Sequence, residues 1–556
     1  MPDTSCKGIA PAIPDITTGA MLGVLSVFLP LFAMHVSQQK IPFVRALSVL
    51  SATLFLSFSP ASVPMASAQG VSLPRMGDGA ELTTNDERRL GDGIARQLYR
   101  DPDYIDDPVV HSYVMGIWHP LKEAAVQRGD LSPELDERFA WEVLLGRDRT
   151  INAFALPGGF LGVHLGLVGA VSTRDELASV LAHELSHVTQ RHIARLMAQD
   201  KRSTPLMIGS MILGALAASR SPDAGMAMMM GGQALAVQNQ LSFSRDMERE
   251  ADRVGFGLMA PAGFAPSGFA SMFERLQQAN RINDNGSWPY LRSHPLTTER
   301  IADMQARTQR LGAAAQAKPP TLEHAMVSSR ARVLTRPGPD VLRQWAALPG
   351  SAGFITQAAS AQAGALYAAI LGLMQLRDLK GAEAMLPRLQ ALTQDDASAQ
   401  RQTLWLAAEL ALMANQPQIA LQKLEQLPPS MTSKEHNPEA DRATLLLRAQ
   451  ALSSLHRSAE AVGALQTWVT DHGHDAPAWQ ALARATRESG KPLPALRAEA
   501  EAFVAQYDYA AAVDRFKAGQ QLAQRSGAQA DHFEASIIDT RLRATQSLLR
   551  EQAAER

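Results

Sequence analysis

The stretch AHELSHVTQRH, from Ala182 to His192, places three histidines and a glutamate close together in an apolar-periodic segment that predicts a helix. Residues four apart lie on the same face of a helix. His183 and His187 can therefore offer two imidazoles to one tetrahedral zinc ion, with Glu184 beside the water that the metal activates. Zinc lowers the pKa of such a water to about 7, and the glutamate can take its proton during attack on a carbonyl. The pattern predicts metal-assisted hydrolysis.

A catalytic zinc needs a third protein ligand and one open position. The downstream stretch SFSRDMEREADRVGFG carries Glu248 and Asp252 four residues apart on another predicted helix. On these residues alone an alternative stays open, in which Glu248, Glu250 and Asp252 form the solvated acidic face of that helix. The presence of the histidine motif favours the ligand interpretation.

The motif HELSH, followed later in the chain by SRDMEREAD, is similar to the M48 class of zinc metallopeptidases. The resemblance implies one zinc ion per chain, bound by His183, His187 and Glu248. It also implies that Glu184 is the general base, and that Asp252 supports catalysis by orienting a ligand histidine. Carboxylates of this kind fix the tautomer of the imidazole that they contact.

His294 lies in the stretch SHPLTTERIADMQAR. A Ser-His-Pro-Leu stretch of this kind resembles the periplasmic branch of the M48 class, whose members carry tetratricopeptide repeats. The resemblance implies that His294 can occupy the open position of the zinc as a regulatory fourth ligand and hold the enzyme latent. The alternative is a loop histidine ahead of a helix.

Two other histidines are not expected to bind the metal. His192 lies five residues beyond His187, and on a continuous helix this spacing turns it well away from the zinc face. We expect it to be a polar or packing residue. His164, near a predicted turn, is expected to be a bystander.

The hairpin stretch INAFALPGGF also matches the M48 class, in which an Asn-Ala-Phe-Ala strand lies beside the zinc helix. An edge strand there can pair with an extended peptide through main-chain hydrogen bonds. The candidates for this substrate-binding role are Asn152, Ala153, Phe154 and Ala155. An ordinary core strand is the alternative.

The elements that must position these residues follow from the hydrophobic pattern. Short strands are expected at residues 141–145, 151–156 and 160–168. The Pro-Gly-Gly turn at 157–159 joins the last two strands into a hairpin. The helix that follows has Thr173 and Glu176 placed as a capping box. Upstream, two amphipathic helices are expected on either side of a break at Asp101–Asp107.

From about residue 328 strands are no longer expected, and alanine-rich helical segments recur in a manner typical of an α-solenoid. The stretch from Ala476 to Phe503 resembles a tetratricopeptide repeat. The chain is therefore predicted to be mainly α. Residues 69–327 would form a zincin-like α+β metallopeptidase domain with a small β-sheet and the HExxH helix. Residues 328–556 would form an all-α solenoid of the tetratricopeptide type.

Residues 1–68 are predicted to be a leader. The apolar run from residue 46 follows basic residues and ends in small residues, which is the pattern of a signal peptide cleaved near Ala68. Translation could start at Met34. An uncleaved anchor is the alternative, but each apolar run is shorter than the ~20 residues of a spanning helix. Because Cys6 is the single cysteine, the mature chain would have neither disulfides nor cysteine ligands.

The 556 residues carry a formal net charge of −2, so no overall basic field favours nucleic acid as a partner. Residues 205–240 are rich in Met, Gly and Ala, and methionine is common on surfaces that accept varied apolar partners. This segment is interpreted either as a buried helical hairpin or as a lid or apolar substrate surface. Peripheral membrane contact through it stays open.

These features predict a zinc endopeptidase in the periplasm. The resemblance implies that its substrates are unfolded or stalled proteins, including outer-membrane β-barrel proteins, and that the barrel-assembly machinery is a partner. The concave surface of a solenoid suits protein clients, so a chaperone role is also expected. The alternative is a chaperone or scaffold for outer-membrane protein assembly whose zinc site is mostly latent. A hydrolase of small molecules is less favoured, because a solenoid suits polypeptides better.

Overall fold

The computed structural model describes six stretches of the chain, which are residues 82–199, 244–282, 289–312, 318–427, 438–526 and 531–554. Residues 76–556 group as one compact unit. The predicted leader with its cleavage point near Ala68, the start at Met34 and the Met-rich segment 205–240 lie outside the described residues. These three expectations stay predictions.

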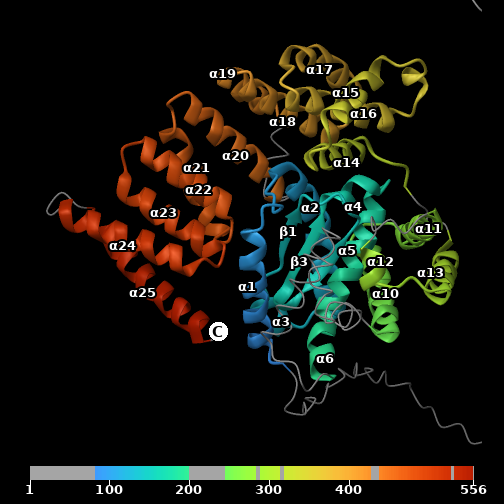
Figure 1. Ribbon diagram of the computed structural model, residues 1–556, viewed down its shortest axis with the longest axis horizontal. Coiled ribbons are helices and arrows are strands. Elements are labelled where there is room, and N and C mark those ends of the chain that lie inside the picture. Colours follow the sequence, from blue (N-terminus) through green and yellow to red (C-terminus); the bar gives the residue numbers. More distant parts are fainter. Residues whose placement is uncertain are drawn as a thin grey trace, which may run out of the picture. The chain divides into compact units, whose positions relative to one another are not determined.

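A small three-stranded sheet lies in the N-terminal half (Figure 1). Its strands are β1 (Glu142–Gly146), β2 (Ala153–Leu156) and β3 (Phe160–His164), in the order β1-β3-β2. β1 is parallel to β3 and β2 is antiparallel to it, so β2 lies at an edge of the sheet. The predicted hairpin is confirmed, and its turn residues Gly158 and Gly159 have φ angles of 73° and 85°, which favour glycine.

The third strand is shorter than predicted. β3 ends at His164, and the residues expected to continue it form helix α4 (Leu165–Ala170). A short apolar run is compatible with either a buried strand or a buried helix, so the pattern alone could not decide. Gly166 marks close packing there, because a β-carbon at this position would lie 2.1 Å from the carbonyl oxygen of Arg149. The strand prediction over residues 165–168 is therefore wrong.

Helix α5 (Arg174–Thr189) is buried along nearly its whole length. The Thr173 hydroxyl accepts the backbone N–H of Glu176 at 3.1 Å, as a capping residue should. The Glu176 carboxylate accepts the N–H of Ser172 at 2.6 Å, so the capping box closes one residue earlier than the predicted one. The helix stops near Arg191, whose φ of 52° is left-handed, and α6 (His192–Gln199) begins directly after it.

Further helices pack around α5 and the sheet. They are α1 (Thr84–Tyr99), α2 (Pro108–Arg128), α3 (Pro133–Arg138), α10 (Arg245–Met259), α11 (Ser267–Ile282), α12 (Tyr290–Ser293) and α13 (Thr298–Leu311). The predicted break at Asp101–Asp107 is confirmed, since it separates α1 from α2. α10 lies very close to α5, because a β-carbon on Gly255 would lie only 3.0 Å from the carbonyl carbon of Ala182.

The C-terminal half is all helical (Figure 1). Its helices are α14 (Leu322–Leu334), α15 (Pro339–Ala347), α16 (Ala359–Gln375), α17 (Leu379–Thr393), α18 (Ala397–Met413), α19 (Pro417–Glu425), α20 (Pro438–Ser454), α21 (Ala459–Asp471), α22 (Ala476–Glu488), α23 (Pro492–Ala505), α24 (Tyr509–Ser526) and α25 (His532–Ala554). Together with the N-terminal half, this is the predicted mainly α architecture of a zincin-like domain and an all-α region. The predicted repeat at 476–503 coincides with α22 and α23, and its identity as a tetratricopeptide repeat stays a prediction. The domain boundary after residue 327 also stays a prediction, and that position lies within α14.

A buried arginine joins α2 to the helical half. Arg330 on α14 donates two hydrogen bonds, of 2.8 and 2.6 Å, to Asp107. It donates two more, of 2.8 and 2.6 Å, to Glu409 on α18. Asp107 also accepts the backbone N–H of Val110 at 2.9 Å and thereby caps α2. One guanidinium thus holds a helix cap of the first half and a carboxylate of the second in bidentate geometry.

A second arginine repeats this arrangement next to the first. Arg442 on α20 bridges Asp106, which precedes α2, and Asp475, which precedes α22, through four hydrogen bonds of 2.7–2.9 Å. We call the contacts of Arg330 and Arg442 with Asp107 and Asp106 the arginine clamps. Next to them along the chain, Val109 packs in an apolar cluster with Trp405 and other side chains of the helical half. The start of α2 is therefore fixed by both ion pairs and apolar contacts.

A third contact between the halves involves β1. Glu142 accepts hydrogen bonds from the hydroxyls of Tyr99 at 3.0 Å and of Tyr507, between α23 and α24, at 2.8 Å. Arg88 on α1 donates to the Tyr507 hydroxyl at 3.3 Å. Burial raises the pKa of Glu142 to about 7, although these hydrogen bonds and the charge of Arg88 oppose the rise.

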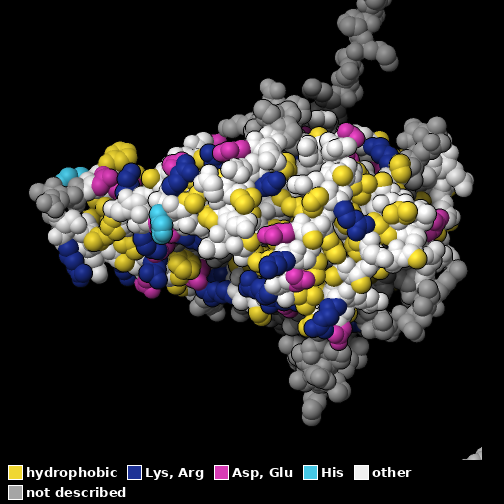
Figure 2. Space-filling view, turned by 90° about the horizontal axis from the view of Figure 1, so that it is seen from above, with side chains coloured by type: hydrophobic (Ala, Val, Ile, Leu, Met, Phe, Trp, Pro, Cys, Tyr) yellow, Lys and Arg dark blue, Asp and Glu magenta, His cyan; other side chains and the backbone are white. Residues whose placement is uncertain are grey.

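Within the part of the chain that the structure describes, no helix is long and apolar enough to cross a membrane. The face drawn in Figure 2 shows basic and acidic side chains interspersed among apolar ones. This mixture agrees with the small net charge of the sequence.

We expect Arg330→Ala to destabilise the folded protein by about 3–5 kcal/mol, because two nearly buried carboxylates then lose their partner. Chemical denaturation followed by tryptophan fluorescence measures the change. The matched control is Arg343→Ala, which breaks an ion pair with Asp340 on the surface, where such pairs contribute little. Equal effects of the two substitutions would show that the clamp has no special importance for stability.

We expect the folded state to lose the stabilising contribution of protonated Glu142 as the pH rises through about 7. Its pKa is about 7 when folded and 4.5 as a free side chain, so between these values only the folded state keeps the proton. This contribution is complete below pH 4.5 and is lost above pH 7. It amounts to about 3 kcal/mol, at about 1.4 kcal/mol per pKa unit.

Melting temperatures at about pH 5 and about pH 8 test this expectation. Glu142→Gln cannot titrate, so its melting temperature should differ less between the two pH values than that of the wild type. Identical pH dependence in both proteins would contradict the assignment.

Candidate metal centre

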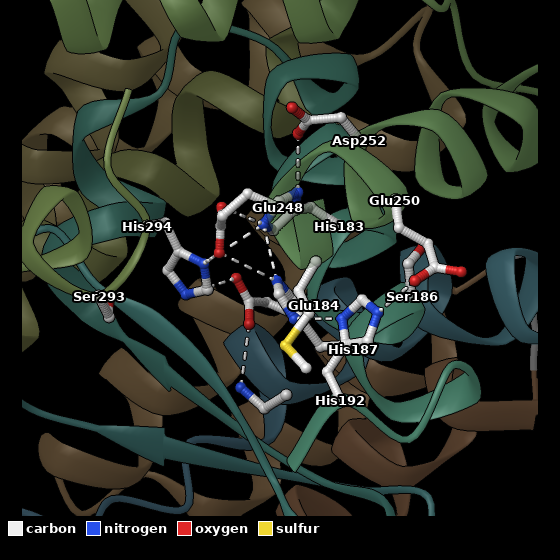
Figure 3. A network of polar contacts seen from close by, with 12 residues as sticks. His183, Glu184, Ser186, His187, His192, Glu248, Glu250, Asp252, Ser293 and His294 are labelled. Atoms are coloured by element: carbon white, nitrogen blue, oxygen red, sulfur yellow. Dashed lines mark hydrogen bonds and ion pairs between the residues drawn. The ribbon is translucent and has the colours of Figure 1, made fainter. Parts of the chain in front are cut away.

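Three parts of the fold bring polar side chains to one point (Figure 3). Helix α5, helix α10 and the loop after α12 supply His183, Glu184, His187, Glu248, Asp252 and His294. Each of these six side chains is at most 2% exposed. The turn of α5 places the two histidines of the HExxH motif on one face, as the spacing predicts.

Four donor atoms converge on a common centre, one each from His183, His187, Glu248 and His294. The Nε2 atom of His183 lies 3.0 Å from Nε2 of His187 and 3.4 Å from Oε2 of Glu248. The Nδ1 atom of His294 lies 3.3 Å from Nε2 of His183 and 2.9 Å from Oε1 of Glu248. In a tetrahedral site with metal–ligand distances of about 2.0–2.1 Å, neighbouring donors lie about 3.3–3.4 Å apart.

This donor set fits one zinc ion in size and in its nitrogen and oxygen composition. Hydrogen bonds alone explain this arrangement less well than a metal ion does. The Nε2 atoms of His183 and His187 are directed at each other and at the Glu248 carboxylate, so one proton cannot serve all of these contacts. Burial and the neighbouring charge of His183 lower the pKa of His187 well below its usual value. The imidazole is then neutral, which is the form that binds a metal.

Glu184 is directed at the same centre. Its Oε2 atom accepts the backbone N–H of Ala155 at 3.0 Å. Its Oε1 atom has no hydrogen-bond partner among the described residues and lies 3.5 Å from Nε2 of His294. Burial raises the pKa of Glu184 above its usual value, although the neighbouring histidines oppose the rise. A carboxylate with a raised pKa is a better proton acceptor, as a general base requires.

Asp252 lies behind His183 and not at the centre. One of its oxygens, Oδ1, is 3.0 Å from Nδ1 of His183. Arg300 on α13 donates to both oxygens of Asp252, at 2.6 and 2.8 Å, and its Nη1 atom lies 2.7 Å from Oε2 of Glu248. Burial opposes ionisation of Asp252, but Arg300 holds its pKa below the usual value. The carboxylate is therefore charged and can hold the ring of His183.

Arg300 was not among the residues predicted from the sequence. It follows His294 by six residues in SHPLTTER, so a signal existed, but an arginine in the first turn of an amphipathic helix has no distinctive spacing. Its importance comes from burial, since it is 4% exposed and contacts two carboxylates of the site.

His294 reaches the centre from the loop after α12. Its ring stacks on Tyr290, with ring centroids 4.6 Å apart, and its backbone N–H donates to the carbonyl of the same tyrosine at 2.9 Å. The structure thus gives the donor set a fourth protein member. The regulatory role of His294 stays a proposal.

The two histidines expected to be bystanders lie outside the donor set. His164 is the buried last residue of β3, and its Nδ1 atom is 2.9 Å from the Thr150 hydroxyl. His192 is not turned away from His187 as a continuous helix would require, because the helix breaks at Arg191. Its Nδ1 atom lies 2.9 Å from Nδ1 of His187.

The predicted substrate strand lies beside α5. Asn152 immediately precedes β2, and its carbonyl accepts the N–H of His164 at 3.0 Å. The register pairs Phe154 with Gly162, so the backbone groups of Ala153 and Ala155 face away from β3. The N–H of Ala155 already points at Glu184. The use of this edge by a peptide stays a proposal.

Residues 122–308 match the model of Peptidase family M48, and this range contains every site residue discussed above. The beta-barrel assembly-enhancing protease of Escherichia coli K12 is 34% identical over 265 residues, which are 47% of this chain and 52% of that protein. Its counterpart in Yersinia pestis is 34% identical over 241 residues, 43% of this chain and 48% of that protein. The chain thus spans about half the length of these bacterial relatives.

A more distant relative comes from mitochondria. The mitochondrial metalloendopeptidase OMA1 of Arabidopsis thaliana is 31% identical over 159 residues, which are 29% of this chain and 30% of that protein. The name metalloendopeptidase describes the same class of chemistry that the donor set of this chain supports.

Removal of one donor should abolish tight zinc binding. We expect His183→Ala to weaken zinc affinity by more than about 100-fold and Asp252→Asn, which acts through His183, by about 10–100-fold. Competition with a chromophoric chelator measures the dissociation constants. His532→Ala, an exposed histidine on α25, is the control and should bind zinc as the wild type does. Undiminished affinity in His183→Ala would exclude this site.

Proposed function

We propose that this chain, which carries an M48 metallopeptidase domain within residues 122–308, is a zinc-dependent endopeptidase. The observation that carries the proposal is the buried convergence of one donor atom each from His183, His187, Glu248 and His294, with Glu184 Oε1 3.5 Å from Nε2 of His294. Arrangements of this kind, with a glutamate beside two helical histidines, suit hydrolysis of a peptide bond.

His183, His187 and Glu248 would hold the metal. When bound, the metal would act as a Lewis acid that polarises the carbonyl of the substrate peptide and lowers the pKa of the attacking water. Glu184 would accept the proton of the attacking water at Oε1, since Oε2 is already held by the Ala155 N–H. The same hydrogen bond keeps the carboxylate from rotating away. Asp252 would keep His183 in the tautomer that presents Nε2 to the metal.

The edge of β2 offers a site for the substrate backbone. The outward-facing N–H of Ala155 is bound by Glu184, so a peptide added as a strand along this edge would lie with its backbone beside the base. Recognition of this kind depends on main-chain hydrogen bonds and is tolerant of side chains. It suits unfolded polypeptides as substrates.

His294 would keep the site latent. Its Nδ1 atom lies 3.3 Å from Nε2 of His183, so His294 would add a fourth protein ligand where a catalytic zinc needs an open position. Its Nε2 atom lies 3.5 Å from Glu184. Displacement of the loop after α12 would therefore have to precede cleavage. The burial of all four donors, each at most 2% exposed, supports this view.

The cellular setting is proposed from the relatives. The proteins named beta-barrel assembly-enhancing protease support action on unfolded or stalled outer-membrane β-barrel proteins, with the barrel-assembly machinery as partner. The protein would act in the periplasm, as the resemblance of the sequence implies, and would reach it through the predicted signal peptide. The helical half would present its surface to such clients.

A second function is favoured by the position of His294. A site closed by a protein ligand suits a protein that acts mainly as a chaperone or scaffold, with the helical half binding clients. In that case cleavage would be rare even in the presence of zinc.

Cleavage of casein and of an outer-membrane barrel protein stalled in assembly distinguishes these functions. Glu184→Gln should lower the rate of cleavage by about 10²–10⁴-fold while zinc stays bound, because it removes the base and no ligand. His294→Ala should cleave several-fold faster than the wild type, because it opens the fourth position. Product formation is followed by gel electrophoresis and mass spectrometry.

The zinc content of each variant is the control for these rates. If neither wild type nor His294→Ala cleaves more than Glu184→Gln at full zinc occupancy, the endopeptidase proposal is wrong and the scaffold function is favoured. If His294→Ala cleaves more slowly than the wild type, the latency proposal is wrong.

A further inference from the structure

The second ring nitrogen of His187 makes a contact that the zinc site itself does not explain. Nε2 of His187 belongs to the donor set, while its Nδ1 atom lies 2.9 Å from Nδ1 of His192. The Nε2 atom of His192 lies 3.1 Å from Oε2 of Glu250 on α10. Both histidine side chains are 0% exposed. Figure 3 shows the three residues in line, leading away from the metal centre.

The proton positions along this line follow from its two ends. A ligand nitrogen carries no proton, so the proton of neutral His187 lies on Nδ1. It must be donated to Nδ1 of His192, which therefore carries its own proton on Nε2 and donates it to the Glu250 carboxylate. The carboxylate accepts only, so it sets the tautomer of His192 and, through it, the tautomer of His187.

The local backbone is bent in a way that creates this contact. On a continuous helix, five residues advance by about 500°, which would point His192 some 140° away from His187. The left-handed φ of 52° at Arg191 interrupts the helix and returns the next side chain to His187. Such a conformation is costly for a residue with a β-carbon, by about 1–3 kcal/mol.

The side chain of Arg191 holds the bend in place. Its guanidinium donates to the buried carboxylate of Glu87 at 3.0 Å and to the carbonyl of Leu82 at 2.5 Å. Arg195 in turn donates to Oε2 of Glu250 at 2.8 Å. Arg191 thus holds the bend between His187 and His192, and Arg195 holds the carboxylate of Glu250 at the outer end of the line.

The same logic operates on the other ligand histidine. The Nδ1 atom of His183 is 3.0 Å from Asp252, and that carboxylate is held by Arg300. Each HExxH histidine therefore has a carboxylate and an arginine behind it. For His187 an additional imidazole lies between the ligand and the carboxylate.

We propose that His192 is a positioning residue for the metal ligand His187, and that Glu250 sets the tautomer of both rings. The inference rests on the proposed zinc function, since it concerns how a ligand is held. His192 contributes no donor to the metal. It fixes which nitrogen of His187 faces the centre and at what angle.

The test compares two substitutions of His192, of which only one keeps a hydrogen-bond acceptor facing His187. His192→Asn retains a hydrogen-bond acceptor at the position of Nδ1, while His192→Phe fills the space and removes the acceptor. We expect His192→Phe to weaken zinc affinity by about 10–100-fold and His192→Asn to stay within a few-fold of the wild type. Zinc dissociation constants are measured by competition with a chelator, and melting temperatures of the zinc-free proteins are recorded in parallel.

A matched control removes a buried histidine elsewhere. His324 is 1% exposed and contacts the Tyr113 hydroxyl and the Val171 carbonyl, away from the donor set. His324→Phe should leave zinc affinity unchanged even if the melting temperature falls. Wild-type zinc affinity in His192→Phe, or equal losses in His192→Phe and His192→Asn, would overturn the proposal.

The outcome separates this inference from the proposed protease function. If the affinities follow the expected order but no variant cleaves protein, the endopeptidase proposal fails and the role of His192 stands. If the wild type cleaves protein while His192→Phe binds zinc as tightly as the wild type, the protease function stands and the role of His192 is wrong.

Discussion

The close packing of α10 on α5 is the contact on which the site depends. α5 supplies the HExxH residues from one face, and α10 must bring Glu248 within 3.4–3.6 Å of both histidines. This is achieved where Gly255 meets the backbone of Ala182, since a β-carbon there would lie 3.0 Å from a main-chain carbon. A larger side chain would separate the helices. His183 and His187 would then keep their spacing, because both lie on α5. They would lose the contact with Glu248, because that carboxylate comes from α10.

Burial makes the charge balance of this centre demanding. Glu184, Glu248 and Asp252 are nearly unexposed, and an ionised carboxylate without compensation is very costly in such surroundings. Arg300 contacts two of them. Burial would lower the pKa of His183, yet Asp252 and Glu248 raise it to about 9, so the surroundings of that ring favour positive charge. A divalent cation held between the donors would supply such charge without a proton, and these groups could then be buried together.

Local spacing was enough to predict that His183 and His187 share one face of a helix, which the structure confirms. It was not enough for Glu248, which on spacing alone could lie on a solvated acidic face and was expected as a ligand only from the resemblance to the M48 class. The hairpin before α5 was also predictable from its Pro-Gly-Gly turn. The length of β3 was not, because an apolar run suits a strand or a helix equally. Nor was the role of His192, since a helix break at Arg191, held by Glu87 from a distant helix, leaves no mark in the periodicity. The ion pairs of Arg330 with Asp107 and of Arg442 with Asp106 could not be predicted either, because they join residues far apart in the chain.

The arginine clamps connect the helical half to the zinc helix by a route separate from His294. Asp106 and Asp107 hold the start of α2 against Arg442 and Arg330, and α2 packs against α5. The loop that carries His294 has different supports, namely the stacking on Tyr290 and a hydrogen bond of 2.8 Å from Arg300 to the Pro295 carbonyl. If His294 holds the site latent as proposed, opening the fourth position would require these loop contacts to break, while the contacts of Arg330 and Arg442 could remain. Helix α5 would then keep its place, as the proposed base Glu184 requires.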